Sequence, residues 1–338
     1  MVRGMGNTPF KNKSVLITGG TGSFGQAMAK KLLEEDICSK VIIFSRDEWK
    51  QWEMQRSDPI FTSHKIRYFL GSIRDLKRLN LAFRDVDIVI HAAALKQVPA
   101  AEYNPSEFIQ TNVTGAMHII EAAIERKVEK VIALSTDKSV NPVNLYGATK
   151  LCSDKLIIAA NAYVGNQKVP KFSVVRYGNV LGSRGSIIPL WKQMVESGAK
   201  ALPITDPDMT RFWITLDEAV DFVSRCARVM KGEEIFVPKI PSAKTIDLVK
   251  ALSPKIKTEV IGIREGEKLH ELLISPEEAP YTFEHEDYYT LLPPVHDRSL
   301  EDRISRQRYK GKPVPKNFSY GSDNNPDMWS IKKLKRIL

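Results

Sequence analysis

The chain has 338 residues, a length that favours one large domain with a smaller lobe over a single compact domain. Its composition, 43% hydrophobic and 27% charged, is typical of a soluble globular enzyme, and three scattered cysteines (Cys38, Cys152 and Cys226) argue against a disulfide framework or a zinc knuckle. The net charge of +10 favours an anionic partner, but the basic residues are spread along the chain until its tail. A solvated basic face therefore explains the charge better than binding of nucleic acid.

Apolar runs and cysteines also indicate where the protein resides. No run approaches the ~20 apolar residues of a membrane span, and the first residues lack the apolar core of a signal peptide. Unpaired cysteines favour a reducing compartment. We therefore expect a soluble, cytoplasmic protein that neither enters a membrane nor binds nucleic acid.

Strand-like and helix-like segments alternate through the first half of the chain. Helical stretches are predicted at residues 25–35, 76–83, 112–126 and 146–163. Between them lie short apolar runs of the kind found in strands that are buried on both faces: SVLITGG, KVIIFSR, KIRYFLGS, VDIVIHAAA, KVIALST and KFSVVRYG. This alternation predicts an α/β fold of the Rossmann type, with a doubly wound parallel sheet.

The alternation ends after Gly178, where loops rich in Gly, Ser and Pro follow. We expect residues 1–181 to form the cofactor-binding Rossmann domain, with residues 213–240 returning to it. Residues 182–338 are expected to form mainly a smaller substrate-binding lobe and a C-terminal arm, rich in Pro, Asn and charge, that wraps the body or a neighbouring subunit.

A glycine-rich turn joins the first strand to the first helix. Gly19, Gly22 and Gly25 stand at the spacing Gly-x-x-Gly-x-x-Gly. Glycine lets the backbone approach a pyrophosphate, and the helix N-terminus supplies free N–H groups and the positive end of its dipole. The turn, with Thr21, Ser23 and Phe24, therefore predicts a dinucleotide site.

The second strand ends in Ser45 and Arg46, with Lys50 one turn further on. An enzyme that uses NAD tends to carry an acid here for the ribose 2′-hydroxyl, whereas a hydroxyl and a guanidinium suit a 2′-phosphate. The pattern favours NADP over NAD. A solvated arginine at a strand end is the alternative, and the acid Asp47 is an argument against NADP.

Tyr146 and Lys150 lie four residues apart on one face of a predicted helix. An ammonium beside a phenol stabilises phenolate, so the tyrosine can take a hydroxyl proton while hydride leaves the carbon. In a chain that also has a glycine-rich turn nearer its N-terminus, this Tyr-x-x-x-Lys pair predicts a nicotinamide enzyme.

Several motifs together resemble the extended short-chain dehydrogenase/reductase superfamily: the glycine turn, HAAALK, STDK, YGATK and RYGNVLGSRGS. Within it, STDKSVNPVNLYGATKL, DMTRFWITLDEA and GEKLHE resemble the inverting UDP-N-acetylglucosamine 4,6-dehydratases of pseudaminic acid synthesis, which supplies sugars for flagellin or surface glycans. The resemblance covers residues 15–289 and part of the tail. It implies an NADP-dependent hydro-lyase that oxidises C4 of UDP-N-acetylglucosamine, eliminates water across C5 and C6, and returns the hydride to C6.

The resemblance also assigns roles in the catalytic stretch. Asp137 is implied as the proton donor to the leaving C6 oxygen, Lys138 as the base at C5, and Thr136 as a group that aligns the sugar. A base that works near neutral pH needs a lowered pKa, so we expect burial to lower the pKa of Lys138. An Asp–Lys pair in solvent is the alternative.

Further site residues follow from the same resemblance. It implies a homo-oligomer (a dimer or a hexamer) and no metal, and His270–Glu271 lacks the second histidine of a His-Glu-x-x-His zinc site. Two departures from the family pattern are Ser72, where an Asp that touches adenine is usual, and Glu265, where proline is usual. The remaining assignments are Ser72, Ile73, Ala92 and Lys96 for the cofactor, and Lys96, Asn179, Arg211, Arg264 and Glu267 for the substrate.

Three alternatives stay open. A nucleotide-sugar 4-epimerase would not need Asp137 and Lys138, and C5-retaining dehydratases carry Glu at the position of Lys138. A nucleotide-sensing or RNA-binding protein that kept the fold without catalysis would not need Tyr146, Lys150, Asp137 and Lys138 together.

Overall fold

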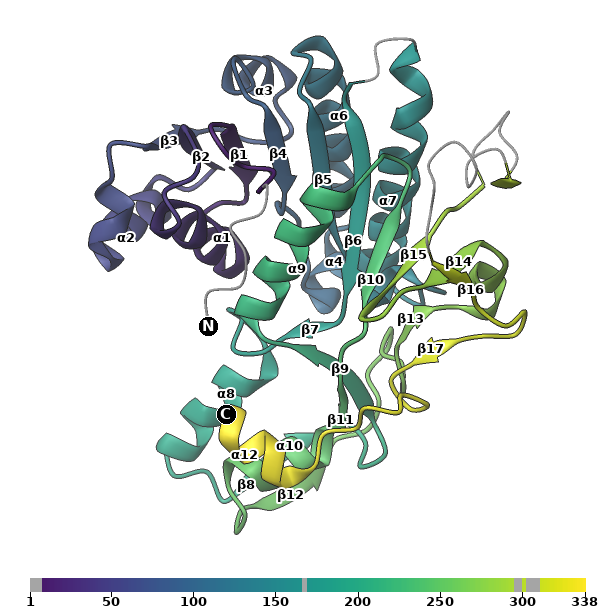
Figure 1. The fold of residues 1–338 in the computed structure, drawn as a ribbon. Helices are drawn as coiled ribbons and strands as arrows, with labels where there is room; N and C mark the ends of the chain where they lie inside the picture. The colour runs from purple at the N-terminus through teal and green to yellow at the C-terminus, as the bar shows by residue number, and fades with distance from the viewer. Residues whose placement is uncertain (1–7, 166–168, 295–299, 302–310) are drawn as a thin grey trace.

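The computed structural model describes residues 8–165, 169–294, 300–301 and 311–338. They form a large α/β body with a smaller lobe beside it, drawn below the body in Figure 1. Across these ranges, no helix combines the length and the apolar character that crossing a membrane would require.

Ten strands form the main sheet, in the order β16-β14-β15-β10-β6-β5-β4-β1-β2-β3. The six strands from the first half of the chain follow the Rossmann order 3-2-1-4-5-6, all parallel, as predicted. Strand order reverses at β1 and β4, which places a binding crevice at their carboxyl ends. The parallel strands are β1 (Ser14–Thr18), β2 (Lys40–Ser45), β3 (Ile66–Leu70), β4 (Ile88–His91), β5 (Lys130–Thr136), β6 (Lys171–Tyr177) and β10 (Ile235–Pro238).

Burial on both faces explains the apolar runs. Every residue of β1 is buried, and its Val15 pairs with Val41 of β2 and with Ile88 of β4. The edge strand β3 is different, because only Ile66 is buried while the rest of the strand is partly or fully exposed. The interior strands therefore form the core on which the site is built.

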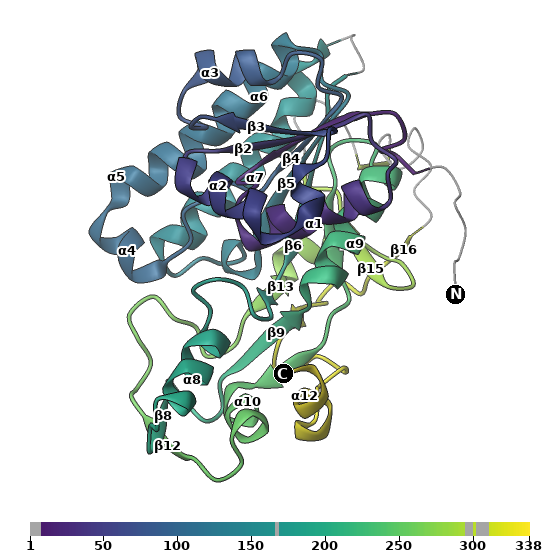
Figure 2. The ribbon, with the colours of Figure 1, turned by 90° about the vertical axis from the view of Figure 1, so that its left-hand side faces the viewer.

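Helices cover both faces of the sheet. Figure 2 shows α1 (Ser23–Glu34) and α9 (Leu216–Val229), which pack together, on one side, and α3 (Leu76–Ala82), α6 (Gly115–Glu125) and α7 (Leu145–Tyr163) on the other. The predicted helices are confirmed, except that the one expected from residue 112 becomes α-helical only at Gly115, because a π-helical turn, η2 (Ile109–Thr114), occupies the residues before it. Shorter helices complete the body: α2 (Glu48–Ser57), η1 (Pro59–Thr62), α4 (Val98–Tyr103) and α5 (Pro105–Phe108).

The second half of the chain also adds strands to the main sheet. β10 pairs in parallel with β6, and β15 (Tyr288–Leu291), β14 (Thr282–Glu284) and β16 (Lys312–Pro313) continue the sheet antiparallel. A 3₁₀ helix, η5 (Pro276–Tyr281), leads into β14. Residues far beyond the predicted boundary at 181 therefore extend the large sheet.

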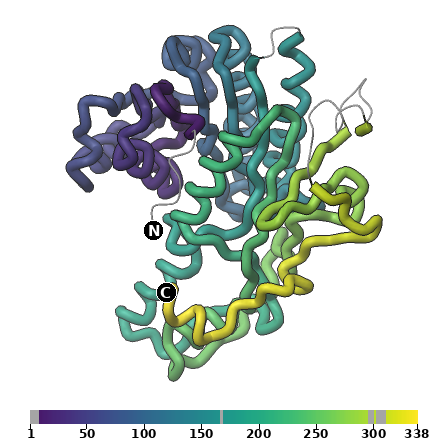
Figure 3. Tube along the Cα trace, in the orientation of Figure 1, coloured from purple at the N-terminus to yellow at the C-terminus, as the bar shows by residue number. Residues whose placement is uncertain are grey.

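The lobe has an apolar cluster of its own, in which Trp191, Trp213 and Leu248 are buried. The last part of the chain, yellow in Figure 3, crosses this lobe and ends in a helix that packs on α10. The elements of the lobe and of the segments that join it to the body are β7 (Asn179–Val180), α8 (Ile187–Glu196), β8 (Ala201–Ile204), β9 (Thr210–Ile214), β11 (Ser242–Lys244), α10 (Thr245–Leu252), β12 (Lys257–Val260), β13 (Leu272–Ile274), β17 (Tyr320–Gly321) and α12 (Ile331–Ile337).

Candidate active site

A pocket of about 1080 Å³ lies between the carboxyl ends of the parallel strands and the lobe. Its walls include the glycine turn after β1, the loops after β4 and β5, the start of α7, and lobe residues from α8, β9 and the loop after β12. A space of this size can hold a dinucleotide and a nucleotide sugar together. All the predicted site residues line it except Ser72 and Asp137.

The glycine turn fits a dinucleotide. Gly22 is the N-cap of α1, and because it has no side chain to accept from the first N–H groups of the helix, these donors remain available to a phosphate. Gly25 is required by close packing, because a Cβ there would lie 2.6 Å from the Cα and carbonyl oxygen of Gly20. The turn thus brings the helix N-terminus tightly against the end of β1.

Two side chains at the end of β2, those of Arg46 and Ser45, were predicted to contact a 2′-phosphate, and they differ in how accessible they are. Arg46 is exposed on the pocket wall and has no ion pair within the described part of the chain. The Ser45 hydroxyl is buried and already accepts a hydrogen bond from the Gln51 amide at 3.1 Å. Asp47 caps α2 and pairs with Lys50 at 3.1 Å, which gives this acid a structural role.

Ser72 does not line the pocket, although Ile73 and Ala92 on the neighbouring loops do. The Ser72 hydroxyl instead accepts a hydrogen bond from the backbone N–H of Arg74 at 3.2 Å. This geometry gives Ser72 a role in the turn after β3, and its assignment to the cofactor has no support from the pocket.

The catalytic stretch runs from β5 through a 3₁₀ turn, η3 (Asp137–Ser139), into α7. The Asn144 side chain caps α7 by accepting the Gly147 N–H at 2.7 Å. A Cβ at Gly147 would lie 2.2 Å from the carbonyl oxygen of Lys138, so glycine there allows η3 to pack against α7. This packing brings Thr136, Lys138 and Tyr146 to one pocket wall.

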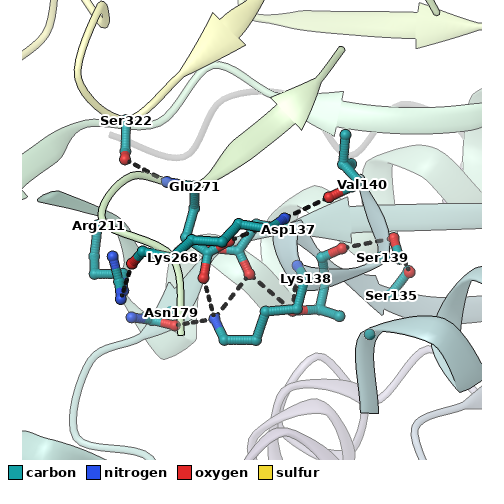
Figure 4. A network of polar contacts seen from close by, with 12 residues as sticks. Ser135, Asp137, Lys138, Ser139, Val140, Asn179, Arg211, Lys268, Glu271 and Ser322 are labelled. Carbon is teal, nitrogen blue, oxygen red and sulfur yellow. Dashed lines mark hydrogen bonds and ion pairs between the residues drawn. The ribbon is translucent and has the colours of Figure 1, made fainter. Parts of the chain in front are cut away.

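Three oxygens surround the ammonium of Lys138, which Figure 4 shows together. Its Nζ lies 3.1 Å from Asp137 Oδ1, 3.3 Å from Glu271 Oε1 and 3.5 Å from Asn179 Oδ1. Burial disfavours the charged form, but the two carboxylates outweigh it and raise the pKa of Lys138. The expected lowering of this pKa is therefore wrong for the protein without substrate.

Asp137 is fully buried behind this wall. Its Oδ1 accepts hydrogen bonds from Lys138 Nζ and, at 2.9 Å, from the Thr136 hydroxyl, whereas Oδ2 has no hydrogen-bond partner among the described residues. Asp137 therefore contacts the pocket through its neighbours in this structure. Its role as proton donor to the sugar stays a prediction.

Tyr146 and Lys150 are also buried, and burial shifts the pKa of each side chain. Burial raises the pKa of Tyr146 to about 12, even though Lys138 and Thr136 act to lower it. Burial also lowers the pKa of Lys150, whose Nζ donates to the carbonyl oxygen of Leu134 at 2.7 Å. The positive charge of Lys138 thus favours the phenolate form of Tyr146.

Three of the predicted substrate residues, Arg211, Arg264 and Glu267, lie on the lobe side of the pocket. Arg264 is exposed there, and the buried Oε2 of Glu267 has no hydrogen-bond partner within the described ranges. Arg211 instead donates to three backbone carbonyls, those of Thr210, Lys268 and Leu269, at 2.7, 2.8 and 3.0 Å. Arg211 thus stabilises the loop that carries Arg264 and Glu267. Its contact with the substrate stays a prediction.

Lys96 connects the cofactor and substrate sides. It is exposed in the pocket, where the surrounding walls and the charge of Lys138 lower its pKa. Its loop is fixed by Asn112 in η2, which exchanges two hydrogen bonds of 2.9 Å with Leu95 and donates to Thr149 of α7 at 3.0 Å. Sequence reasoning missed Asn112, and only its position before an apolar helix could have drawn attention to it.

Glu271 is the more important of the two residues that sequence reasoning missed. It lines the pocket beside Lys138 although its side chain is almost fully buried. The GEKLHE motif contains it, but the motif by itself indicated only an incomplete zinc site at this position. Within the described ranges, no group of three or more His, Cys, Asp or Glu side chains could hold a metal ion.

Comparison with known proteins gives consistent matches along most of the chain. A model of the polysaccharide biosynthesis protein family matches residues 15–293. A protein of Campylobacter jejuni subsp. jejuni serotype O:23/36 (strain 81-176), named UDP-N-acetylglucosamine 4,6-dehydratase (inverting), is 54% identical over 331 residues, which are 97% of this chain and 98% of that protein. A UDP-glucose 4-epimerase of Rickettsia canadensis (strain McKiel) is 42% identical over 298 residues, covering 86% and 85%.

A solved structure agrees with these matches. Pen from Bacillus thuringiensis is similar with a TM-score of 0.86 and 35% identity, and 97% of each chain is covered. The resemblance inferred from the motifs is confirmed. The chain belongs to the family of polysaccharide biosynthesis proteins that includes the inverting UDP-N-acetylglucosamine 4,6-dehydratases.

Proposed function

We propose that the protein is an NADP-dependent hydro-lyase, a UDP-N-acetylglucosamine 4,6-dehydratase that inverts C5. One observation carries the proposal: the contact of 3.1 Å between Lys138 and Asp137 lies in the same site as Tyr146 and Lys150. The second pair supplies the redox chemistry of a dehydrogenase, and the first adds an acid and a base that simple oxidation does not need. The 54% identity to an enzyme with this name supports it.

The redox half of the site fits a nicotinamide cofactor, which when bound would accept the C4 hydride and later return it to C6. The glycine turn at Gly22 and Gly25 would hold the pyrophosphate. Tyr146 would take the proton of the C4 hydroxyl, and Lys150 would position the cofactor beside it. NADP is proposed over NAD because Arg46 lines the pocket at the end of β2 without an ion pair among the described residues.

The dehydration half uses the Asp137–Lys138 pair as a unit that holds one proton. A ketone at C4 makes the C5 hydrogen acidic. When the shared proton resides on Asp137, Lys138 is a neutral amine that can take the C5 proton, and Asp137 can protonate the leaving C6 oxygen as water departs. These steps return the pair to the ammonium–carboxylate form that the structure shows. Thr136, which donates to Asp137 at 2.9 Å, would hold that acid and align the sugar.

Other parts of the proposal concern the whole protein. Residues 1–181 with 213–240 would bind the cofactor. Residues 182–338 would supply most of the contacts to the UDP-sugar, including those of Arg211, Arg264 and Glu267, and Asn179 would add a contact from the edge of the body. We further propose a cytoplasmic homo-oligomer, a dimer or a hexamer.

Incubation with UDP-N-acetylglucosamine and catalytic NADP tests the function. The expected product by NMR is UDP-2-acetamido-2,6-dideoxy-β-L-arabino-hex-4-ulose, with C5 inverted. Because the hydride returns to C6, the absorbance of reduced nicotinamide should not grow with product. Stoichiometric growth of that absorbance would show an ordinary dehydrogenase instead.

The identity to a UDP-glucose 4-epimerase favours a second candidate, a nucleotide-sugar 4-epimerase. This activity also leaves the cofactor unchanged overall, so absorbance alone does not separate the two. The NMR spectrum does, since an epimer keeps its C6 hydroxyl and acquires no ketone. An epimer as the main product would reject the dehydratase.

A further inference from the structure

Glu271 is a charged pocket residue without an assigned role in the proposed chemistry. It lies just before β13, its side chain is 3% exposed, and its Oε1 is 3.3 Å from Lys138 Nζ. Figure 4 shows it on the side of the ammonium opposite the rest of the lysine side chain, beside Asp137 and Asn179. Glu271 therefore provides one of the oxygens that surround the proposed base.

The second oxygen of this carboxylate faces another cation. Lys268 Nζ lies 3.7 Å from Oε2, and it also donates to the carbonyl oxygen of Val140 at 2.6 Å. In the part of the chain that the structure describes, Oε2 itself has no hydrogen-bond partner. A buried carboxylate is costly unless it is paired with cations, so its place between two lysines needs an explanation beyond packing.

The backbone of Glu271 is fixed by the C-terminal segment. Its N–H donates to the Ser322 hydroxyl at 2.9 Å, and the Ser322 N–H donates to the Glu271 carbonyl at 2.8 Å. The Ser322 hydroxyl also contacts the Thr210 hydroxyl at 2.7 Å. Segments that are distant in sequence thus hold this glutamate at a defined distance from Lys138.

We propose that Glu271 is a positioning residue for Lys138, which keeps the lysine nitrogen at the pocket wall and next to Asp137 while the shared proton moves between them. Asn179 and Asp137 alone leave one N–H of the ammonium without an acceptor, and Glu271 supplies that acceptor. This inference rests on the proposed function, because it concerns the C5 step of that reaction.

Glu271→Gln keeps the size and one acceptor oxygen of the side chain, so it should retain most of the wild-type rate of C5 exchange. Glu271→Ala removes the acceptor that Lys138 uses, and this variant tests the inference. We expect roughly 10- to 100-fold slower exchange of the C5 proton with deuterated solvent, less than the full loss of a general base. Formation of reduced nicotinamide in a single turnover and KM for the sugar should stay near wild-type values. Glu277→Ala, at an exposed glutamate in η5, is the matched control and should leave both steps unchanged.

Ser322→Ala gives a second, milder perturbation that does not touch the pocket charge. It should slow C5 exchange in the same step-specific manner, by about a few-fold, since a lost neutral hydrogen bond is worth about 1 kcal/mol. Equal slowing of hydride transfer and C5 exchange in Glu271→Ala would show a merely structural role and overturn the inference. Unchanged C5 exchange in both variants would also overturn it. A wild-type protein that turns over no UDP-N-acetylglucosamine would instead reject the proposed function.

Discussion

The carboxylates of Asp137 and Glu271 favour the charged form of Lys138, yet the proposed C5 step needs Lys138 as a neutral amine. Its raised pKa comes from Asp137 and Glu271, which together exceed the effect of burial. Deprotonation by solvent near neutral pH is therefore unfavourable. Transfer of the proton to Asp137, whose Oδ1 is 3.1 Å away, produces the amine and the acid in one step without a change in net charge. The contact between Lys138 and Asp137 thus favours a pair that titrates together over two groups that titrate independently.

Asp137→Asn tests this coupling. An amide removes the negative charge that raises the pKa of Lys138, so that pKa should fall and the amine form should become more populated at a given pH. An amide cannot protonate the C6 oxygen, so dehydration should slow by ~10²–10⁴-fold. We expect C5 exchange in deuterated solvent to survive while product formation fails. Equal loss of exchange and product would contradict the proposed division of roles.

Arg46→Ala tests the choice of cofactor at the end of β2. If the guanidinium contacts a 2′-phosphate, its loss should weaken NADP by about 1.5–3 kcal/mol and leave NAD almost unaffected. Binding of each cofactor can be measured by calorimetry. Arg56→Ala is the control, because Arg56 lies on α2 over the ring of Trp52 and does not line the pocket. Equal weakening of NADP and NAD would show that Arg46 supports the fold.

At the scale of elements, the site depends on how closely helices approach the turns before them. Gly25 lets α1 pack against Gly20, and Gly147 lets α7 pack against the turn that carries Lys138. The glycine spacing in the sequence predicted the first contact. Nothing in YGATK alone predicted the second, because it joins a helix to the backbone of a residue nine positions earlier in the chain.

Gly25→Ala and Gly22→Ala should separate packing from cofactor contact. A Cβ at position 25 would lie 2.6 Å from backbone atoms of Gly20, whereas one at position 22 approaches only the Gly19 carbonyl oxygen, at 3.2 Å. Gly25→Ala should lower the free energy of unfolding by about 1–3 kcal/mol, as overpacking does, and should weaken cofactor binding. Gly22→Ala should weaken binding with little loss of stability. Urea unfolding and cofactor titration measure both, and equal stability of the two variants would contradict this packing argument.

The parallel strands were predictable because each is a short apolar run between turn residues, and β1 shows this most clearly. The antiparallel strands β14, β15 and β16 were not, since they are short and their partners are distant in sequence. The pocket residues from the glycine turn and β5 to α7 followed from motifs. Glu271 did not, because its meaning depends on contacts with Lys138, Lys268 and Ser322 from separate segments.

At the scale of the whole molecule, the two largest apolar clusters of the described residues lie in the body and in the lobe. The larger one fills the Rossmann body, and the smaller one contains Trp191, Leu248 and Leu334. Leu334 belongs to the C-terminal helix α12, which the sequence placed only within a loosely structured arm. The end of the chain therefore contributes to the core of the lobe that faces the pocket.

Leu334→Ala should weaken the lobe and spare the body. The leucine is fully buried, so its truncation should cost about 2–5 kcal/mol of local stability. We expect KM for the nucleotide sugar to rise while the affinity for NADP stays near that of the wild type. Lys335→Ala, at an exposed neighbouring position, is the control. Parallel loss of both affinities would contradict two separately stabilised cores.

Lys138 adds the C5 step to an otherwise ordinary redox site in the proposed mechanism, and Lys138→Ala tests this role most directly. A single turnover in deuterated solvent should record reduced nicotinamide by absorbance and C5 exchange by NMR. We predict that this variant binds the sugar, forms and retains reduced nicotinamide, and loses C5 exchange by ~10²–10⁴-fold. Tyr146→Phe should form no reduced nicotinamide, because its block precedes the ketone. Exchange of C5 at the wild-type rate in Lys138→Ala would mean that another group is the base and would contradict the proposed mechanism.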